Sequence, residues 1–82
     1  MPQIISAQIS LYPLRRPELS PAIEEILQVL RSKGLEVRQG AMSTLVAGEQ
    51  DLVWDSLKDA WRRAAASGDL VLVATFSNAC PR

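Results

Sequence analysis

Apolar and polar residues alternate between positions 5 and 12, the first regular pattern in the chain. A period of two is the spacing of side chains on opposite faces of a β-strand, so this stretch predicts a strand with one apolar and one polar face. The predicted apolar face consists of Ile5, Ala7, Ile9 and Leu11. The predicted polar face consists of Ser6, Gln8, Ser10 and Tyr12. We expect Pro13 to end this strand, because proline lacks the backbone N–H that a ladder needs.

Two later stretches have the period of an amphipathic helix, with apolar residues three and four positions apart. The first lies between Ser20, a suitable N-cap, and Gly34, which fits the position after a helix end. Its apolar stripe consists of Ile23, Ile26, Leu27 and Leu30. The second begins near Asp51, and its stripe consists of Val53, Leu57, Ala60, Trp61 and Ala64. We therefore expect Trp61 in the core, whereas Trp54 lies on the flank of the stripe.

Three further strands are predicted at residues 35–39, 43–47 and 70–76. The first two are separated by Gly40 and a few neighbours, which is typical of a hairpin. Residues 70–76 form an unbroken run of apolar and β-branched residues. Such a run is typical of a strand covered on both faces, so the last strand predicts a partner chain, a ligand, or both.

The predicted order of elements is β-α-β-β-α-β, which indicates an α+β domain of the ferredoxin-like class spanning residues 1–82. Right-handed crossovers place strands one and three at the centre of a four-stranded antiparallel sheet and strands two and four at its edges. The two helices cover one face and leave the other open. We expect that open face to carry the polar residues of the first strand together with apolar residues such as Val71 and Val73, as a homodimer or a ligand pocket requires.

Composition narrows the possible functions. Nine basic and nine acidic residues cancel, which argues against a nucleic-acid-binding or anionic-membrane-binding surface. The chain has no histidine and a single cysteine, Cys80, so histidine-based catalysis and a zinc site are not expected. The start of the sequence has no signal-peptide pattern, and no apolar run spans a bilayer. We expect a cytoplasmic protein that is not an enzyme and holds neither metal nor cofactor.

Two polar groups are candidates for ligand recognition. Ser43 and Thr44 begin the predicted third strand, and Glu49 follows its predicted end. Ser77 and Asn78 follow the last strand. Taken singly, each also fits a turn or a helix cap. Together with Gln8 and Tyr12 they form a set of donors and acceptors around one sheet face, suited to a small polar heteroaromatic ligand.

Four segments, residues 7–13, 40–44, 48–49 and 75–81, resemble the YkoF-like thiamin/hydroxymethylpyrimidine-binding proteins, in the same order along the chain. The resemblance implies a ferredoxin-like domain that binds thiamin or its pyrimidine half as a ligand without transforming it. Longer members carry two such domains in tandem, so this single domain implies a homodimer or a dimer of dimers. Glu49 or Asp51 would face the positive charge of thiamin. The ligand contacts implied by the resemblance are Ser43, Thr44, Ser77, Asn78, Gln8 and Glu49.

An alternative remains open. An ACT-like regulatory or protein-interaction domain would use the open sheet face only to pair with another protein, without a thiamin-type ligand. A polar ligand pocket would favour the first interpretation, and a dry apolar contact would favour the second.

Overall fold

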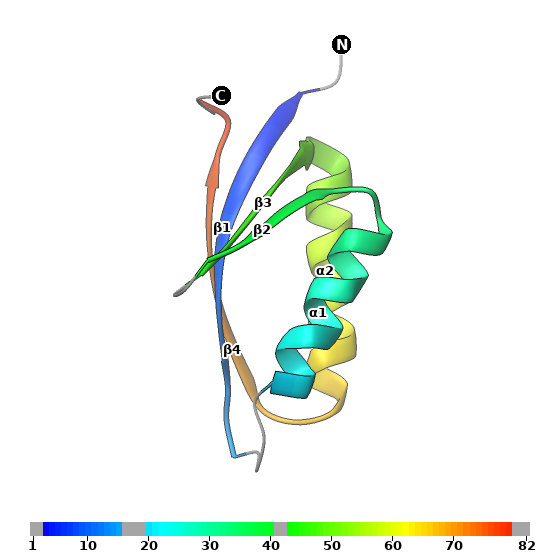
Figure 1. Ribbon diagram of the computed structural model, residues 1–82, viewed down its shortest axis with the longest axis vertical. Helices are drawn as coiled ribbons and strands as arrows, with labels where there is room; N and C mark the ends of the chain where they lie inside the picture. The colour runs from blue at the N-terminus through cyan, green and yellow to red at the C-terminus, as the bar shows by residue number, and fades with distance from the viewer. Residues whose placement is uncertain (1–2, 16–19, 41–42, 80–82) are drawn as a thin grey trace.

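A computed structural model of the chain describes residues 3–15, 20–40 and 43–79. Parts of two segments that carry the family resemblance, residues 41–42 and 80–81, lie outside the described residues, and Cys80 is among them. The elements in chain order are β1 Ile4–Pro13, α1 Ser20–Ser32, β2 Glu36–Gln39, β3 Thr44–Glu49, α2 Gln50–Ala66 and β4 Leu70–Ser77 (Figure 1).

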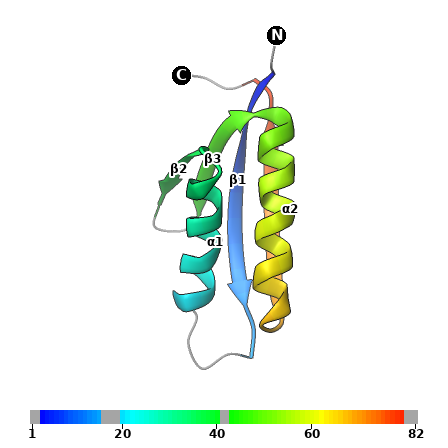
Figure 2. The same ribbon diagram turned by 90° about the vertical axis from the view of Figure 1, so that its right-hand side faces the viewer.

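The four strands form one antiparallel sheet in the order β2-β3-β1-β4. Both helices lie against the same face of this sheet, side by side (Figure 2). This arrangement is the ferredoxin-like α+β fold, and it confirms the predicted fold class with β1 and β3 at the centre. In the part of the chain that the structure describes, no helix has the length and apolarity needed to cross a membrane.

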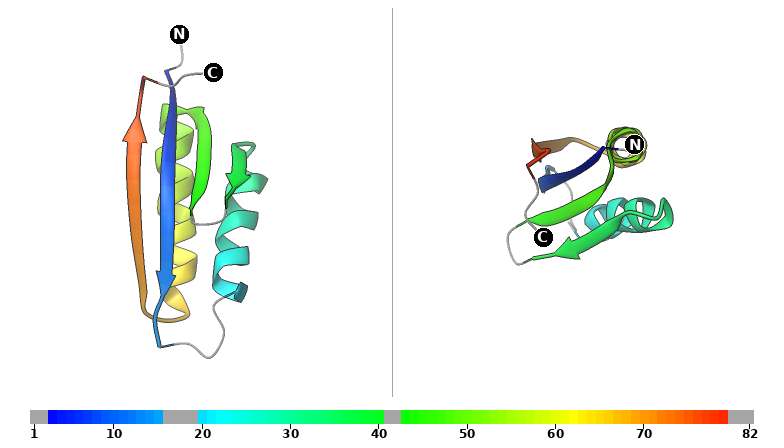
Figure 3. Two further views of the ribbon diagram at one scale, coloured as in Figure 1. Left: turned by 60° about the vertical axis from the view of Figure 1, so that its left-hand side comes forward. Right: turned by 90° about the horizontal axis from the view of Figure 1, so that it is seen from above.

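The strand β1 is longer than its neighbour β3, and this difference shapes the sheet. The ladder between β1 and β3 runs from Ile4 to Ile9, whereas β1 continues to pair with β4 as far as Pro13. The lower halves of β1 and β4 therefore project beyond β2 and β3 as a two-stranded ribbon (Figure 3). One edge of β1 is left without a neighbouring strand beyond Ile9 in the described chain.

Pro13 is the last residue of β1, and it still lies opposite Leu70 in the ladder with β4. The backbone N–H of Leu14 donates to the Asp69 carbonyl at 3.0 Å, so the Leu14–Asp69 pair is hydrogen-bonded. Pairs alternate along an antiparallel ladder, so the nitrogen of Pro13 points away from β4. Proline is tolerated there because β4 does not need the missing N–H.

The core lies between the sheet and the helices. It contains most of the predicted inward-facing residues of β1 and α1, with Val29 as an addition, whereas Leu11 and Ile23 are only partly buried. The α2 stripe is rotated from the predicted one: Ser56 is 1% exposed and Trp61 is 42% exposed. The prediction that Trp61 is a core residue is therefore wrong for the single chain. Small residues face α1 and the sheet, which lets α2 pack closely, and both tryptophans lie on the other flank.

The strand β3 and the helix α2 follow each other without a loop, because β3 continues through Gly48 to Glu49. A Cβ on Gly48 would come within 2.5 Å of the Leu35 Cδ2 atom, so the absent side chain of Gly48 makes room for Leu35. The N–H of Gln50 donates to the Gln3 carbonyl at 2.7 Å and ties the start of α2 to the N-terminal end of the sheet.

The last strand is covered on one face only. Its helix-facing residues are half-buried, whereas Val71 and Val73 are 44% and 52% exposed on the open face. The sequence pattern predicted cover on both faces. In the described part of the chain nothing covers the second face, since both helices lie on the same side of the sheet.

Candidate functional site

The structure divides the six predicted ligand-binding residues between the two ends of β3. Ser43 and Thr44 lie at its start, where Gln8 of β1 is close. Glu49 lies at its end, near the last residue of β4, Ser77. The two ends of a six-residue strand such as β3 are about 17 Å apart. A single small molecule therefore cannot contact both groups within one chain.

The first group is held together by a hydrogen bond. Gln8 Nε2 donates to Ser43 Oγ at 3.2 Å, and the acceptor role leaves the hydroxyl able to donate its own hydrogen. Thr44 is 7% exposed and follows the helix-facing alternation of β3 with Val46. The prediction that these polar residues, together with Tyr12, surround one sheet face is thus wrong, because Gln8 lies on the open face and Thr44 on the helix-facing one.

A pocket of about 120 Å³ opens beside this group, at the side of β1 that β3 does not reach. Pockets for drug-sized ligands have volumes of roughly 300 Å³ or more, so this one suits a single ring. Its apolar residues come from β1 and α1, and its polar residues are Ser10 of β1 and those at the β2–β3 end. It is lined by Ile9, Ser10, Leu11, Ile23, Gln39, Gly40, Ser43 and Thr44.

The backbone of Leu11 adds a donor and an acceptor to this pocket. The alternation fixed by the Leu14–Asp69 hydrogen bond directs the N–H and C=O of Leu11 away from β4. They point toward the side where β3 has already ended, since its ladder with β1 stops at Ile9. In the described residues no strand pairs with this N–H and C=O. Neither the spacing nor the composition of the sequence indicated this feature, which depends on the unequal lengths of β1 and β3.

The second group consists of side chains that already serve local structure. Glu49 is the N-cap of α2 and accepts from the N–H groups of Asp51 at 3.1 Å and Leu52 at 3.2 Å. The Ser77 hydroxyl accepts from the N–H of Ala79 at 3.1 Å, as in a turn. The interpretation of single residues as turns and caps therefore holds for these two positions.

A second, more open pocket of about 380 Å³ lies next to this group, at the start of α2. The rings of Trp54 and Phe76 stack beside it, with centroids 4.0 Å apart and planes at 15°. Trp54 remains 51% exposed, so its indole is available for contact. The pocket is lined by Ile5, Gln50, Trp54, Phe76, Ser77 and Asn78. Tyr12 belongs to neither pocket, since it lies opposite Val71 in the projecting ribbon.

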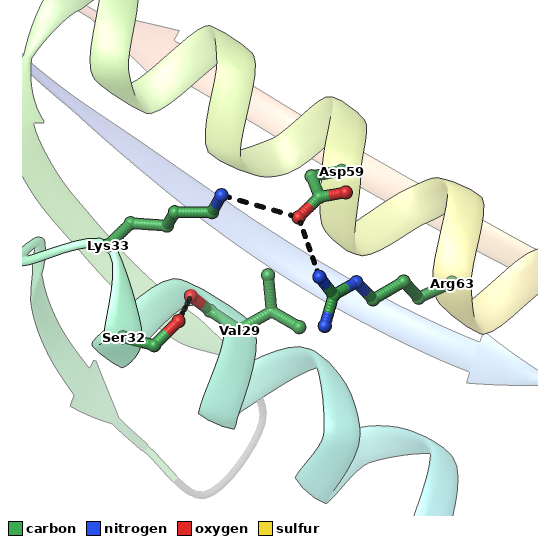
Figure 4. Close-up of polar contacts among 5 residues, drawn as sticks. All are labelled: Val29, Ser32, Lys33, Asp59 and Arg63. Carbon is green, nitrogen blue, oxygen red and sulfur yellow. Dashed lines mark hydrogen bonds and ion pairs between the residues drawn. The ribbon is translucent and has the colours of Figure 1, made fainter.

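Charged side chains elsewhere have structural roles. Asp59 of α2 pairs with Lys33 at 3.4 Å and Arg63 at 3.5 Å, which connects the end of α1 to α2 (Figure 4). Arg15 pairs with Asp69 where the ribbon ends. All of these groups are partly exposed, so each pair contributes little to stability.

Comparison with known proteins gives a family and a fold. The model of the YKOF-related family matches residues 4–82. No protein of curated function matches the chain.

Several solved structures share the fold at low sequence identity. A domain of unknown function, DUF77, from Bacillus cereus is 20% identical, with a TM-score of 0.80 over 93% of this chain and 76% of its own. A hypothetical protein from Methanocaldococcus jannaschii is 22% identical, with a TM-score of 0.82 over 92% and 79%. A Thermotoga maritima protein provisionally assigned to thiamine biosynthesis or salvage is 21% identical, with a TM-score of 0.80 over 90% and 82%.

Proposed function

Because the chain belongs to the YKOF-related family, we propose that it binds thiamin or its hydroxymethylpyrimidine moiety, without converting it, as a homo-oligomer. The assignment of the Thermotoga maritima neighbour to thiamine biosynthesis or salvage supports this class of ligand. Such a binder would serve the salvage, delivery or buffering of thiamin or its precursor.

The observation that carries the proposal is the backbone edge of Leu11, which no described strand pairs, at the pocket that Ser43 also lines. An aminopyrimidine presents an amino donor next to a ring-nitrogen acceptor. The C=O and N–H of Leu11 supply the complementary acceptor and donor, as an adjacent strand would. The pyrimidine ring would thus lie beside β1 at Leu11, beyond the end of the described β1–β3 ladder.

The side chains of the same pocket suit the rest of the ligand. Ser43 and Thr44 offer hydroxyls for the hydroxymethyl group, and Gln8 orients the first of them. Ile9 and Ile23 offer apolar contact to the ring and its methyl group. The volume of about 120 Å³ fits the pyrimidine half better than the whole of thiamin.

Glu49, Ser77 and Asn78 form a second proposed contact set, at the pocket of Trp54. This pocket has an exposed indole, and Glu49 and Asp51 lie at the adjacent start of α2. An indole face and carboxylates favour a cationic ring such as the thiazolium of thiamin. Since one methylene group joins the two rings of thiamin, one molecule cannot occupy both pockets of a chain.

Isothermal titration with hydroxymethylpyrimidine and thiamin tests the proposal. We expect heat of binding with hydroxymethylpyrimidine, and much weaker binding of an analogue whose amino group is replaced by a hydrogen. Absence of heat with both natural compounds at high micromolar concentration would overturn the proposed function. Equal affinity for the analogue would overturn the role of Leu11.

The open face of the sheet supports the homo-oligomer. Its exposed apolar side chains would be covered by face-to-face packing with a second copy. They are Ile4, Tyr12, Leu45, Val71 and Val73.

This apolar face also supports the second candidate function, an ACT-like interaction domain without a thiamin-type ligand. An oligomer that forms normally while the protein ignores both compounds would favour that alternative.

A further inference from the structure

The outer edge of β4 is unprotected. This eight-residue strand lies at the end of the sheet, and no described strand pairs with its outer side. It contains no charged residue and no proline, and its ladder with β1 runs without a bulge. Soluble proteins normally protect such an edge with charges, prolines or bulges, because it offers a template for another strand.

The direction of the backbone groups along this edge follows from one hydrogen bond. Leu14 and Asp69 form a hydrogen-bonded pair, so every second pair of the β1–β4 ladder from there is hydrogen-bonded. Residues at odd positions of β4, such as Val73, bond to β1. Residues at even positions direct their N–H and C=O groups outward, and they are Leu70, Leu72, Ala74 and Phe76.

Two exposed tryptophans flank the same edge on the helix side. Trp54 stacks on Phe76, which places this side of α2 over β4. Trp61 lies two helical turns, about 10 Å, further along α2. Val73 lies about 10 Å from Phe76, toward the start of β4. The strand β4 runs antiparallel to α2 (Figures 1 and 2). Trp61 is therefore level with the middle of β4, and it is 42% exposed.

We propose that a second copy of this chain pairs its β4 with this edge, antiparallel, about a two-fold axis at Val73. The two sheets would then join into one of eight strands with all four helices on the same side. The axis at Val73 uses the whole strand and brings outward-directed groups opposite each other: Leu72 meets Ala74 of the second copy, and Leu70 meets Phe76. A shift by one residue would instead place outward groups opposite inward ones.

Self-pairing fits this edge better than another partner. An uncharged strand brings no like charges together when it meets its own copy. The helix-facing pair Leu72 and Ala74 sets a large side chain against a small one. The two Trp61 side chains lie level with the axis, so each finds cover against the other subunit. A partner of opposite charge would find nothing to recognise on β4.

This pairing uses backbone groups and the helix side of the sheet, so it leaves the open face free. Combined with face-to-face packing it gives a dimer of dimers. It also places the second copy's Leu70 beside Phe76 and adds a wall to the pocket of Trp54. The inference does not depend on the proposed ligand.

Sedimentation velocity on backbone and side-chain variants tests the pairing. Ala74→Pro removes an outward N–H that β1 does not use, and Ala74→Ser is the matched control. Trp61→Glu places a charge beside the axis, and Arg62→Gln makes the same change of net charge at the next, solvent-facing position. We expect both test variants to weaken self-association at least tenfold and to lower the assembled mass twofold at micromolar concentration, while both controls match the wild type.

A second measurement follows the tryptophan itself. In the Trp54→Phe variant all indole fluorescence comes from Trp61, and we expect its quenching by acrylamide to decrease as protein concentration rises. A wild-type protein that sediments at 9.0 kDa at all concentrations would overturn the pairing. Folded test variants that assemble to the wild-type mass would also overturn the pairing. If circular dichroism shows that Ala74→Pro is unfolded, the result for Trp61→Glu alone tests the pairing. Hydroxymethylpyrimidine titrated into folded Ala74→Pro reports separately on the proposed function.

Discussion

Gln8 and Ser43 are joined across the central part of the sheet, where Gln8 Nε2 donates to Ser43 Oγ at 3.2 Å. The bond connects Gln8, on the open face, to Ser43, which lines the pocket of about 120 Å³ beside β1. The amide fixes the hydroxyl as an acceptor and directs the remaining hydrogen toward another partner. The pair therefore prepares a donor at the pocket that also contains Leu11, whose N–H and C=O no described strand pairs.

Ser43→Ala should weaken binding of hydroxymethylpyrimidine about tenfold, because one hydrogen bond of about 1.5 kcal/mol is lost. Gln8→Leu should cost less, since the hydroxyl stays and only its orientation is lost. Isothermal titration measures both. Asn78→Ala is the matched control at the second pocket and should retain wild-type affinity. The reverse result, with Asn78 essential and Ser43 dispensable, would move the pyrimidine site to Trp54.

The arrangement of the elements could be predicted because local patterns determine it. Alternation in β1, the apolar stripe of α1 and the order of elements each have one favourable solution. The pocket at Leu11 could not be predicted, because it depends on where β3 stops pairing with β1. Strand lengths follow from tertiary contacts and turn geometry, and sequence periodicity leaves them uncertain by a few residues.

Replacing Glu49 with alanine should lower the free energy of unfolding by about 1 kcal/mol, since the N–H groups of Asp51 and Leu52 lose their cap. Urea denaturation measures the change, and Glu49→Asp should retain most of the stability. The affinity for hydroxymethylpyrimidine should remain unchanged in the folded variant. A selective loss of thiamin binding would instead identify Glu49 as a partner of the thiazolium ring.

The error at Trp61 has a physical origin. Trp61 and Leu57 both fit an apolar stripe at helical spacing, and a helical period alone does not determine which edge of a broad stripe faces the core. Close packing of α2 favours small residues on the inner side, so Ser56, Ala60 and Ala64 are buried. The tryptophans then lie at the flank next to β4.

Ser56→Ala should raise the free energy of unfolding by about 1 kcal/mol. The hydroxyl of Ser56 is buried, and among the described residues it has no hydrogen-bond partner, so its removal relieves a desolvation cost. Alanine also favours a helix more than serine does. Thermal and urea denaturation measure the change. Ser32→Ala is the control, because Ser32 Oγ bonds to the Val29 carbonyl at 2.8 Å and its loss should not stabilise. Destabilisation by Ser56→Ala would show that the hydroxyl has a partner in solution.

Gly48→Ala should destabilise the domain by about 1–3 kcal/mol, because the added methyl group would lie within 2.5 Å of Leu35 Cδ2. Leu35 is 7% exposed, so it has little room to move. Leu35→Val removes the Cδ atoms, and in that background the same glycine substitution should cost clearly less. A double-mutant cycle by urea denaturation measures this coupling. Additive effects would mean that Gly48 is required for its backbone at the β3–α2 junction, and that the space for Leu35 is not the reason.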